Sequence, residues 1–331
     1  MKHYTMAGVL AVLLVGLAAC APTVTLAPTI APPSSAPTDP QETAAVAVPT
    51  VVDEAPAVEQ PSATPEPPVA ARVNGQPIYL AYYERAVAQY EADLSARGVD
   101  VASEEGQAEM SMARAWILDV MIEQVLAEQA AAEAGVAVLD AEVDAYMQAL
   151  VDENGGQDEF LAKLSERGET YESAREEVRK GLLGMAITQL VSEQVPTVTE
   201  QVHARHILVD TQEEAERILH ELQASADFAS LAKAHSQDAS TKENGGDLGF
   251  FPRGILVAPE VEQVAFALQP GQFSGVISST LGYHIVQVVE RDPQREVSAD
   301  NLLLLQDQAV QQWIESMWAS AFIERYVDVG P

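Results

Sequence analysis

The sequence contains very little cysteine and few basic residues. Cys20 is the only cysteine among 331 residues, so no disulfide can form within the chain. Lysine and arginine together number 18 against 50 aspartates and glutamates, which gives a formal net charge of −32. Nucleic-acid binding depends on clustered lysine and arginine that neutralise phosphates. The composition therefore argues against a nucleic-acid partner and indicates an acidic, self-repelling surface.

Several catalytic motifs are also missing. The sequence has no Gly-x-Ser-x-Gly elbow, no HExxH pair and no glycine-rich loop that ends in Gly-Lys-Ser/Thr. His203 and His206 are three residues apart, and on a strand this spacing places side chains on opposite faces, which suits metal binding poorly. We therefore expect neither a metal nor a cofactor, and no machinery for hydrolysis or phosphoryl transfer.

The apolar run near the start, Met6 to Ala19, is too short to cross a bilayer comfortably. Lys2 precedes it, as in a secretory signal peptide. The run closes on Leu17-Ala18-Ala19-Cys20, which resembles a bacterial lipobox, in which the cysteine is lipidated after cleavage. We expect a lipoprotein signal peptide over residues 1–19 and an extracytoplasmic protein anchored to the membrane through lipidated Cys20. The alternative is a plain secretory signal with a chance cysteine.

Residues 20–70 differ in composition from the rest of the chain. Ala21 to Ala70 is rich in proline, alanine, threonine and valine and contains no lysine or arginine. Such a segment buries too little apolar surface to offset the entropy of ordering. We predict a disordered tether between the lipidated cysteine and a folded body.

Residues 71–197 are predicted to be a nearly all-helical domain. An Asn-Gly turn between Val73 and Ile78 predicts a short strand-turn-strand at its start, and Asp140 is predicted as a helix N-cap. Apolar residues at helical spacing mark the helices: Leu80, Tyr83, Val87, Tyr90 and Leu94; Leu118, Ile122, Val125 and Leu126; Val143, Met147 and Leu150; Phe160, Leu161 and Leu164; Val178, Leu182 and Met185.

Residues 198–292 change to an α+β pattern. "VHARHILV" alternates as a strand does, Thr211 and Glu214 form a capping box, Pro259 opens a helix, and "GVISSTLGYHIVQVVE" predicts strand, turn and strand. Residues 293–331 contain a further helix and a possible final strand, too short to fold alone. We expect this last piece to dock on the helical domain, which makes the α+β domain an insertion.

Two histidines can share one face of the predicted sheet. His206 lies in the first strand and His284 in the last, and the two imidazoles can meet if these strands are antiparallel neighbours. From spacing alone, a pair of core histidines with satisfied hydrogen bonds explains the pattern equally well.

The segments "VHARHILV", "HSQDAST", "GGDLGFFPRG" and "PEVEQVAFALQPGQFSGVISSTLGYHIV" together resemble the parvulin family of peptidyl-prolyl cis-trans isomerases over roughly residues 200–292. The resemblance implies a four-stranded antiparallel sheet surrounded by helices. It implies catalytic roles for His206, Asp238, His284 and Ser279, with Thr280 as an alternative to the serine. It also implies a proline pocket made by Leu248, Leu256 and Val261, with Val257 as an alternative to Leu256.

Two departures from the family pattern affect specificity. Val261 stands where a phenylalanine commonly closes the pocket, so we expect a shallower or differently filled pocket. Val209 to Gln212, after the first strand, holds no lysine or arginine, so we expect no selection of phosphorylated substrates.

The flanking segments, with the lipobox, are similar to PrsA- and SurA-type extracytoplasmic foldases, in which a helical domain forms a cradle for unfolded clients. We expect exposed client contacts at Tyr79, Tyr82 and Tyr83. The expected partners are unfolded or nascent secreted polypeptides that contain Xaa-Pro bonds, and the oligomeric state is left open.

Three functions are compatible with the sequence. The first is a membrane-tethered prolyl isomerase and chaperone that assists the folding of secreted proteins. The second is a catalytically weak holdase that uses the parvulin domain as a peptide clamp, which Val261 favours. The third is a surface lipoprotein that scaffolds other proteins.

Overall fold

The computed structural model describes residues 29–30 and 66–328. The predicted signal peptide, Cys20 and nearly all of the predicted tether lie outside these ranges. Within the described ranges, no helix has both the length and the apolar character needed to span a membrane. The chain divides into two compact units: one runs to Gln189 and resumes at Ile314, and the other spans Leu190–Trp313.

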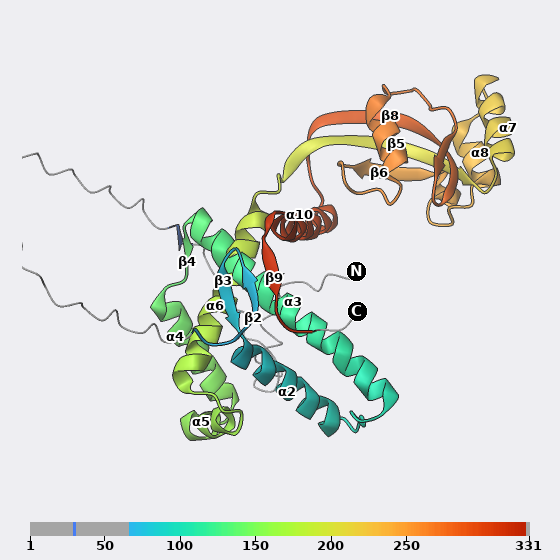
Figure 1. Ribbon diagram of the computed structural model, residues 1–331. Coiled ribbons are helices and arrows are strands. Elements are labelled where there is room, and N and C mark those ends of the chain that lie inside the picture. Colours follow the sequence, from blue (N-terminus) through green and yellow to red (C-terminus); the bar gives the residue numbers. More distant parts are fainter. Residues whose placement is uncertain (1–28, 31–65, 329–331) are drawn as a thin grey trace, which may run out of the picture. The chain divides into compact units, whose positions relative to one another are not determined.

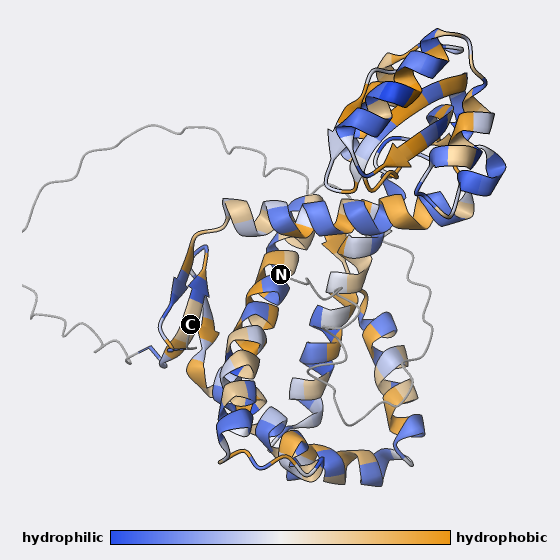
Figure 2. Cartoon of the chain, turned by 90° about the vertical axis from the view of Figure 1, so that its right-hand side faces the viewer, coloured by the Kyte–Doolittle hydropathy of each residue, from blue (hydrophilic) through white to orange (hydrophobic). Residues whose placement is uncertain are grey.

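The first unit, here called the helical unit, consists mainly of long helices (Figure 1). Its helices are α2 (Leu80–Ala96), α3 (Glu104–Ala134), α4 (Asp140–Glu153), α5 (Gln157–Glu166) and α6 (Tyr171–Glu193), whose last residues belong to the second unit. Its strands are β1 (Thr29–Ile30), β2 (Val69–Val73), β3 (Gln76–Tyr79), β4 (Val136–Ala137) and β9 (Ile323–Arg325). Figure 2 shows that each long helix carries both polar and apolar residues, as expected for helices that bury one face.

The strand-turn-strand predicted around Asn74 is confirmed. Both turn residues have positive φ, 52° at Asn74 and 85° at Gly75, which asparagine and glycine adopt most easily. The strands β2 and β3 pair antiparallel, and β9 pairs antiparallel on the other side of β2. The Asn74 side chain also accepts a hydrogen bond of 2.8 Å from the Phe322 N–H. The C-terminal end of the chain is thereby part of the helical unit.

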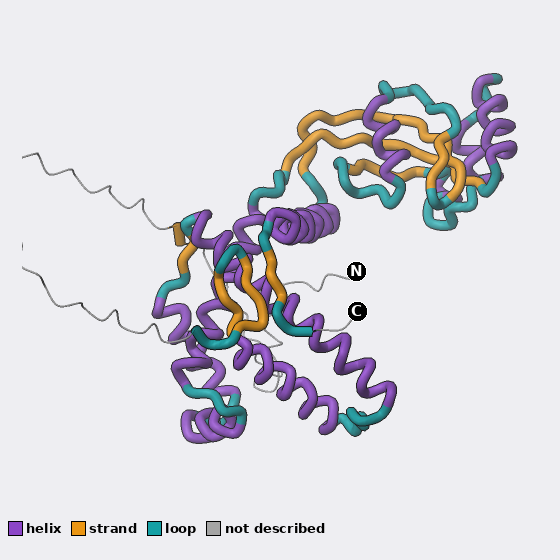
Figure 3. The backbone as a smooth tube through the Cα atoms, in the orientation of Figure 1, coloured by secondary structure: helices purple, strands orange, loops and turns teal. Residues whose placement is uncertain are grey.

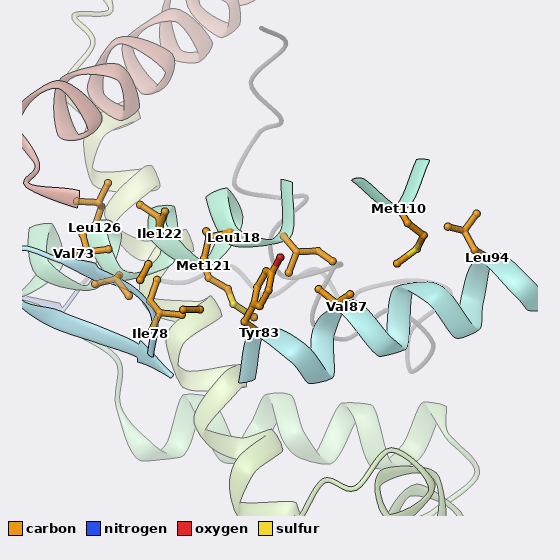
Figure 4. Packing of buried hydrophobic residues seen from close by; sticks show 14 residues of the cluster. Val73, Ile78, Tyr83, Val87, Leu94, Met110, Leu118, Met121, Ile122 and Leu126 are labelled. Carbon is orange, nitrogen blue, oxygen red and sulfur yellow. The ribbon is translucent and has the colours of Figure 1, made fainter. Parts of the chain in front are cut away.

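The core of the helical unit lies between α2, α3 and the small sheet (Figure 4). The predicted stripe residues Val87, Leu94, Leu118 and Ile122 are buried there. Tyr83 is only 5% exposed, and its hydroxyl donates to the carbonyl oxygen of Arg114 at 3.3 Å. The expectation that Tyr83 is an exposed client contact is therefore wrong, because its ring faces α3 rather than solvent.

A second cluster joins α4, α5 and α6. It contains the predicted residues of these helices except Leu161, which is 39% exposed, so the prediction that Leu161 faces the core is wrong. Phe160, Leu164, Val178 and Leu182 are almost fully buried. The N-cap prediction at Asp140 is wrong: α4 begins at this residue, and Leu139 precedes it in the cap position. The Asp140 carboxylate instead forms ion pairs with Arg175 and Arg179 of α6.

The second unit, here called the isomerase-like unit, has one antiparallel four-stranded sheet with helices on both faces (Figure 3). Its sheet has the order β6-β5-β8-β7, built from β5 (Val198–Val209), β6 (Asp247–Phe251), β7 (Ile277–Ser279) and β8 (Gly282–Glu296). Its helices are α7 (Gln212–Gln223), α8 (Phe228–His235), the 3-10 turn η1 (Lys242–Asn244), α9 (Pro259–Ala267) and the first part of α10 (Ala299–Ser320).

The two faces of this sheet bury different sets of side chains. On one face, Ile207 and Ile285 pack against α7 and α8. On the other, Val202, Val286 and Val288 pack against α9. The N-cap half of the capping box predicted at Thr211 and Glu214 is confirmed, because the Thr211 side chain accepts the Glu214 N–H.

The division of the chain differs from the boundaries expected at residues 197 and 292. The strand β8 continues through Pro293 to Glu296, where it still pairs with the start of β5. The first half of α10 stays with the isomerase-like unit, since Gln306 hydrogen-bonds to Ser192 and Gln308 to Gly254. Residues 293–313 therefore group with the α+β unit, and only residues from Ile314 onward group with the helical unit.

Candidate active site in the isomerase-like unit

Two histidines meet on the α9 face of the sheet. In the β5–β8 ladder, His206 is opposite Val286 and Leu208 is opposite His284, so the two histidines are diagonal neighbours. Their rings are nearly parallel, with centroids 5.7 Å apart and an interplanar angle of 22°. Both side chains are buried. The expectation that these imidazoles meet across neighbouring strands is confirmed.

Asp238 anchors the first histidine. Its Oδ2 atom lies 2.6 Å from His206 Nε2 and accepts a 2.6 Å hydrogen bond from the Thr241 hydroxyl. Its Oδ1 atom accepts from both the backbone N–H and the hydroxyl of Ser240. Because ionised Asp238 can only accept, His206 must carry its proton on Nε2 in this pair.

These hydrogen bonds determine the charge of Asp238. Partial burial alone raises the pKa of its carboxyl, but the hydrogen bonds from Ser240, Thr241 and His206 outweigh burial and hold the pKa well below its usual range. Asp238 is therefore a carboxylate at any physiological pH. A fixed negative charge thus lies at the edge of the histidine pair.

The second histidine has a different partner. His284 Nε2 lies 2.7 Å from the Ser279 hydroxyl oxygen, which also accepts the Leu281 N–H. Burial, and then the neighbouring His206, lower the pKa of His284 to about 4. His284 is therefore neutral near pH 7.

The two histidines have different polar partners, and the geometry adds two residues. Asp238 hydrogen-bonds to His206, whereas His284 pairs with Ser279. Ser240 and Thr241 were missed. They follow Asp238 directly in "HSQDAST", and short polar residues two or three positions after an aspartate commonly donate back to its carboxylate.

The expected pocket residues all lie on the α9 face of the sheet. Val261 is 2% exposed, and Leu248 and Leu256 are half-buried against the same cluster. Val257, the alternative to Leu256, is 84% exposed and points away from this cluster. Phe266 was missed: it is 5% exposed and packs edge-to-face on Phe251, with centroids 6.0 Å apart.

The glycine pair before β6 brings two segments together. Gly245 and Gly246 have φ of 73° and 77°, and Gly246 accepts the His206 N–H at 2.8 Å. This turn leads from η1 into Asp247 and Leu248. Asp247 stabilises the next turn by accepting the Gly249 N–H, and it pairs with His203 at 2.7 Å.

This site has the character of a binding surface rather than a metal centre. Across residues 66–328, no cluster of histidine, cysteine, aspartate or glutamate has the arrangement needed to hold a metal ion. His203 and His206 have separate carboxylate partners, Asp247 and Asp238. The arrangement combines an apolar surface with a polar cluster of fixed tautomer and charge.

The helical unit contains a cavity of about 950 Å³ between α2, α3 and α6. Aromatic and aliphatic side chains line much of it, including Tyr79, Tyr82 and Trp116. Tyr82 is 52% exposed, as expected, and its contact with a client stays a prediction. Glu128 and Lys180 also line the cavity, and burial raises the pKa of the Glu128 carboxyl.

Comparison with known proteins identifies both parts of the chain. Residues 206–290 match the PPIC-type PPIase domain, and residues 57–163 match the SurA-like N-terminal domain. The foldase protein PrsA of Caldanaerobacter subterraneus subsp. tengcongensis is 31% identical over 241 residues, which cover 66% of this chain and 72% of that protein. The chain belongs to the PrsA foldase family. It is a peptidyl-prolyl cis-trans isomerase with a parvulin-type domain.

Two further members of the PrsA family were compared. The PrsA foldase of Halalkalibacterium halodurans is 33% identical over 198 residues, which cover 54% of this chain and 59% of that protein. The PrsA peptidylprolyl isomerase of Bacillus anthracis, known from a crystal structure, is 28% identical in sequence to this chain. The match covers 60% of this chain and 88% of the Bacillus anthracis chain, with a TM-score of 0.38.

Proposed function

We propose that this PrsA-family chain is an extracytoplasmic foldase, tethered to the membrane through lipidated Cys20, that isomerises Xaa-Pro bonds in unfolded secreted polypeptides. Residues 1–19 serve as the lipoprotein signal peptide and residues 20–70 as the tether. The sequence "LAAC" supports this anchor. The test is to grow cells that express the full chain with a labelled fatty acid. The label should enter the wild-type protein and should be absent from Cys20→Ser.

The proposed site catalyses a rotation rather than a bond cleavage. The Xaa-Pro amide resists rotation with a barrier of about 20 kcal/mol, because rotation destroys its resonance. An apolar surface of Leu248 and Leu256, packed on the buried Val261, grips the proline ring and removes water from the amide. Neither a nucleophile nor a cofactor is needed for this step.

The polar groups set the electrostatics around the substrate carbonyl. As rotation proceeds, the carbonyl oxygen loses the negative charge that resonance gave it. The Asp238 carboxylate disfavours the resonance-stabilised planar amide more than the twisted one. His206 and His284 hold the geometry and tautomers of the site, and Ser279 orients His284.

The observation that carries this proposal is the Asp238–His206 hydrogen bond beside the stacked histidines. The test is NMR exchange spectroscopy of an Ala-Xaa-Pro-Phe peptide series with the full chain, with Asp238→Ala and His206→Ala measured in parallel. Acceleration that both substitutions reduce supports the site. Acceleration that survives Asp238→Ala contradicts the role given to this carboxylate.

The cavity of the helical unit is proposed to hold apolar segments of unfolded clients. Its aromatic lining offers large contact area at low conformational cost. Replacing Val120 by aspartate places a charge on the cavity wall and is expected to weaken suppression of client aggregation. Because Val120 lies in the helical unit, isomerisation of short peptides serves as the control and should not change.

Val261 supports a second candidate function, a catalytically weak holdase that clamps peptides without accelerating rotation. Valine supplies less ring contact than the phenylalanine common in parvulins. The same NMR experiment separates the two candidates. A full chain that suppresses aggregation but gives no acceleration supports the clamp and contradicts the enzymatic role.

A further inference from the structure

The loop that connects β6 to α9 carries Leu256 but has no regular secondary structure of its own. It spans residues 252–258, and Gly254 within it has a φ of 91°, which a residue with a Cβ adopts only with strain. A loop of this kind is held in one conformation only by contacts with neighbouring elements. Three such contacts are present, and they come from two helices.

The central contact is the Glu262 carboxylate in the first turns of α9. Its oxygens accept the backbone N–H groups of Gly254 at 2.9 Å, Ile255 at 3.0 Å and Leu256 at 3.2 Å. Glu262 forms no ion pair within residues 66–328, so these three consecutive amides are the recorded partners of its charge. Hydrogen bonds to an ionised acceptor are about twice as strong as neutral ones.

The other two contacts come from α10 and from a second residue of α9. The Gln308 side chain of α10 donates to the Gly254 carbonyl oxygen at 2.9 Å. The Arg253 guanidinium lies over the Phe266 ring, 4.1 Å from its centroid. A Cβ added at Gly254 would approach Gln308 and Leu305 to about 3.1 and 3.2 Å, so α10 packs closely on this part of the loop.

We propose that Glu262 is a positioning residue for the isomerisation, and that Gln308 supports it. Glu262 holds Leu256 against the apolar surface on which the proline ring binds, so the charge of Glu262 acts on the substrate only through this loop. The inference rests on the proposed role of Leu256 in the proline pocket. It assigns a task in catalysis to α10, a helix outside the four segments that resemble parvulins.

The test measures KM and kcat separately by NMR exchange with the full chain over a range of peptide concentrations. Glu262→Gln keeps the side-chain length but removes the charge and turns a donor toward the loop. We expect KM to rise about tenfold with kcat within about twofold, since a small misplacement of a binding group weakens capture. Gln308→Ala removes one neutral hydrogen bond, and we expect a rise in KM of about threefold.

Glu213→Gln is the matched control, because Glu213 lies in the first turn of α7, is exposed and makes no recorded side-chain hydrogen bond. A KM for Glu262→Gln equal to that of Glu213→Gln overturns the proposal. A fall in kcat with unchanged KM also overturns it, because partial unfolding reduces the active fraction without changing the affinity. Hydrogen exchange at the Gly254, Ile255 and Leu256 amides should accelerate in Glu262→Gln and Gln308→Ala.

Leu256→Ala separates this inference from the function on which it rests. A raised KM in Leu256→Ala with no change in Glu262→Gln overturns the positioning role alone. An unchanged KM in Leu256→Ala contradicts the assignment of Leu256 to the pocket and overturns the inference with it. A wild-type chain that does not accelerate isomerisation has the same consequence. If Glu262→Gln does not fold, the test rests on Gln308→Ala. An unchanged KM together with unchanged hydrogen exchange at the Gly254 amide in that variant overturns the proposal.

Discussion

The backbone of Gly246 lies directly against the backbone of His206. The His206 N–H donates to the Gly246 carbonyl oxygen, and a Cβ added at Gly246 would overlap the carbonyl oxygen of His206. The strand that presents the histidine and the turn that leads to Leu248 are therefore fixed to one another without any side chain between them. The glycine is required by space as well as by its φ of 77°.

Gly246→Ala is expected to destabilise the isomerase-like unit by more than about 3 kcal/mol, because both the positive φ and the overlap with His206 must be relieved. Gly249→Ala is the matched control: its φ is 67°, but a Cβ there meets nothing within 4 Å. This control should cost about 1–2 kcal/mol, the conformational penalty alone. Urea unfolding of the full chain measures the free energy of unfolding of both variants. Equal losses of stability in the two variants would contradict the close approach of Gly246 to the His206 backbone.

Thr241→Val is expected to lower kcat/KM about tenfold and to destabilise the isomerase-like unit by about 1.5–3 kcal/mol, because the lost hydrogen bond is to an ionised carboxylate. The substitution keeps the shape of the side chain but removes the hydroxyl that donates to Asp238, and so loosens the carboxylate that holds His206. Thr199→Val is the control, because this β5 threonine makes no recorded side-chain hydrogen bond in the described part of the chain. Peptide isomerisation measures the effect, and matching rates for the two variants would refute it.

His284 predicts a loss of stability in mildly acidic solution. Its pKa is about 4 in the folded protein against 6.5 for an unperturbed histidine, so between these values the unfolded chain binds more protons. The contribution of neutral His284 to the free energy of unfolding should therefore be fully present above pH 6.5. The free energy of unfolding should then fall by about 3 kcal/mol as the pH drops to 4. Chemical denaturation as a function of pH measures this slope.

The control for this slope is His284→Gln, which should flatten it between pH 6.5 and 4. The groups that act on His284 from neighbouring elements are His206, Glu260 and Asp238. Asp238 loses its stabilising contribution only below its unperturbed pKa of 3.8, so its effect falls outside the same window. An unchanged slope in the variant would show that another group titrates there.

Val261→Phe, which restores the residue common in parvulins, is expected to destabilise the isomerase-like unit by about 1–3 kcal/mol. Val261 is 2% exposed and packs in a cluster that already contains Phe251 and Phe266, so the larger ring must displace buried neighbours. Urea unfolding measures the loss. A gain in stability together with higher activity would show instead that the pocket is incompletely filled.

Patterning along the chain predicted the elements well, because buried helices and strands follow their own periodicity. The Asn74–Gly75 turn and the Thr211 cap could be inferred from short stretches of sequence, whereas the adjacency of His206 and His284 depended on the pairing of β5 with β8. Asp238 was predicted as a site residue and does lie beside His206, but its hydrogen bond to this histidine depends on where two distant segments meet in space. Tyr83 belongs to the predicted apolar stripe with Val87 and Leu94 and is buried with them, so periodicity gave its side correctly and the expectation of an exposed client contact did not.

The least predictable features were those set by distant segments. The hydrogen bond between Gln308 and Gly254 joins residues 54 positions apart. No local sequence pattern indicates that these two residues are in contact. The continuation of β8 through Pro293 also escaped prediction, because proline usually ends a strand.

The pairing of Val198 with Glu296 means that the chain enters and leaves the isomerase-like sheet through two hydrogen-bonded neighbours. Ends held side by side let the intervening sequence be removed and replaced by a short connection without displacing the segments on either side. One deletion between these neighbours therefore removes the catalytic sheet and leaves the helical unit, with its long helices and short strands, as the remaining folded part of the chain.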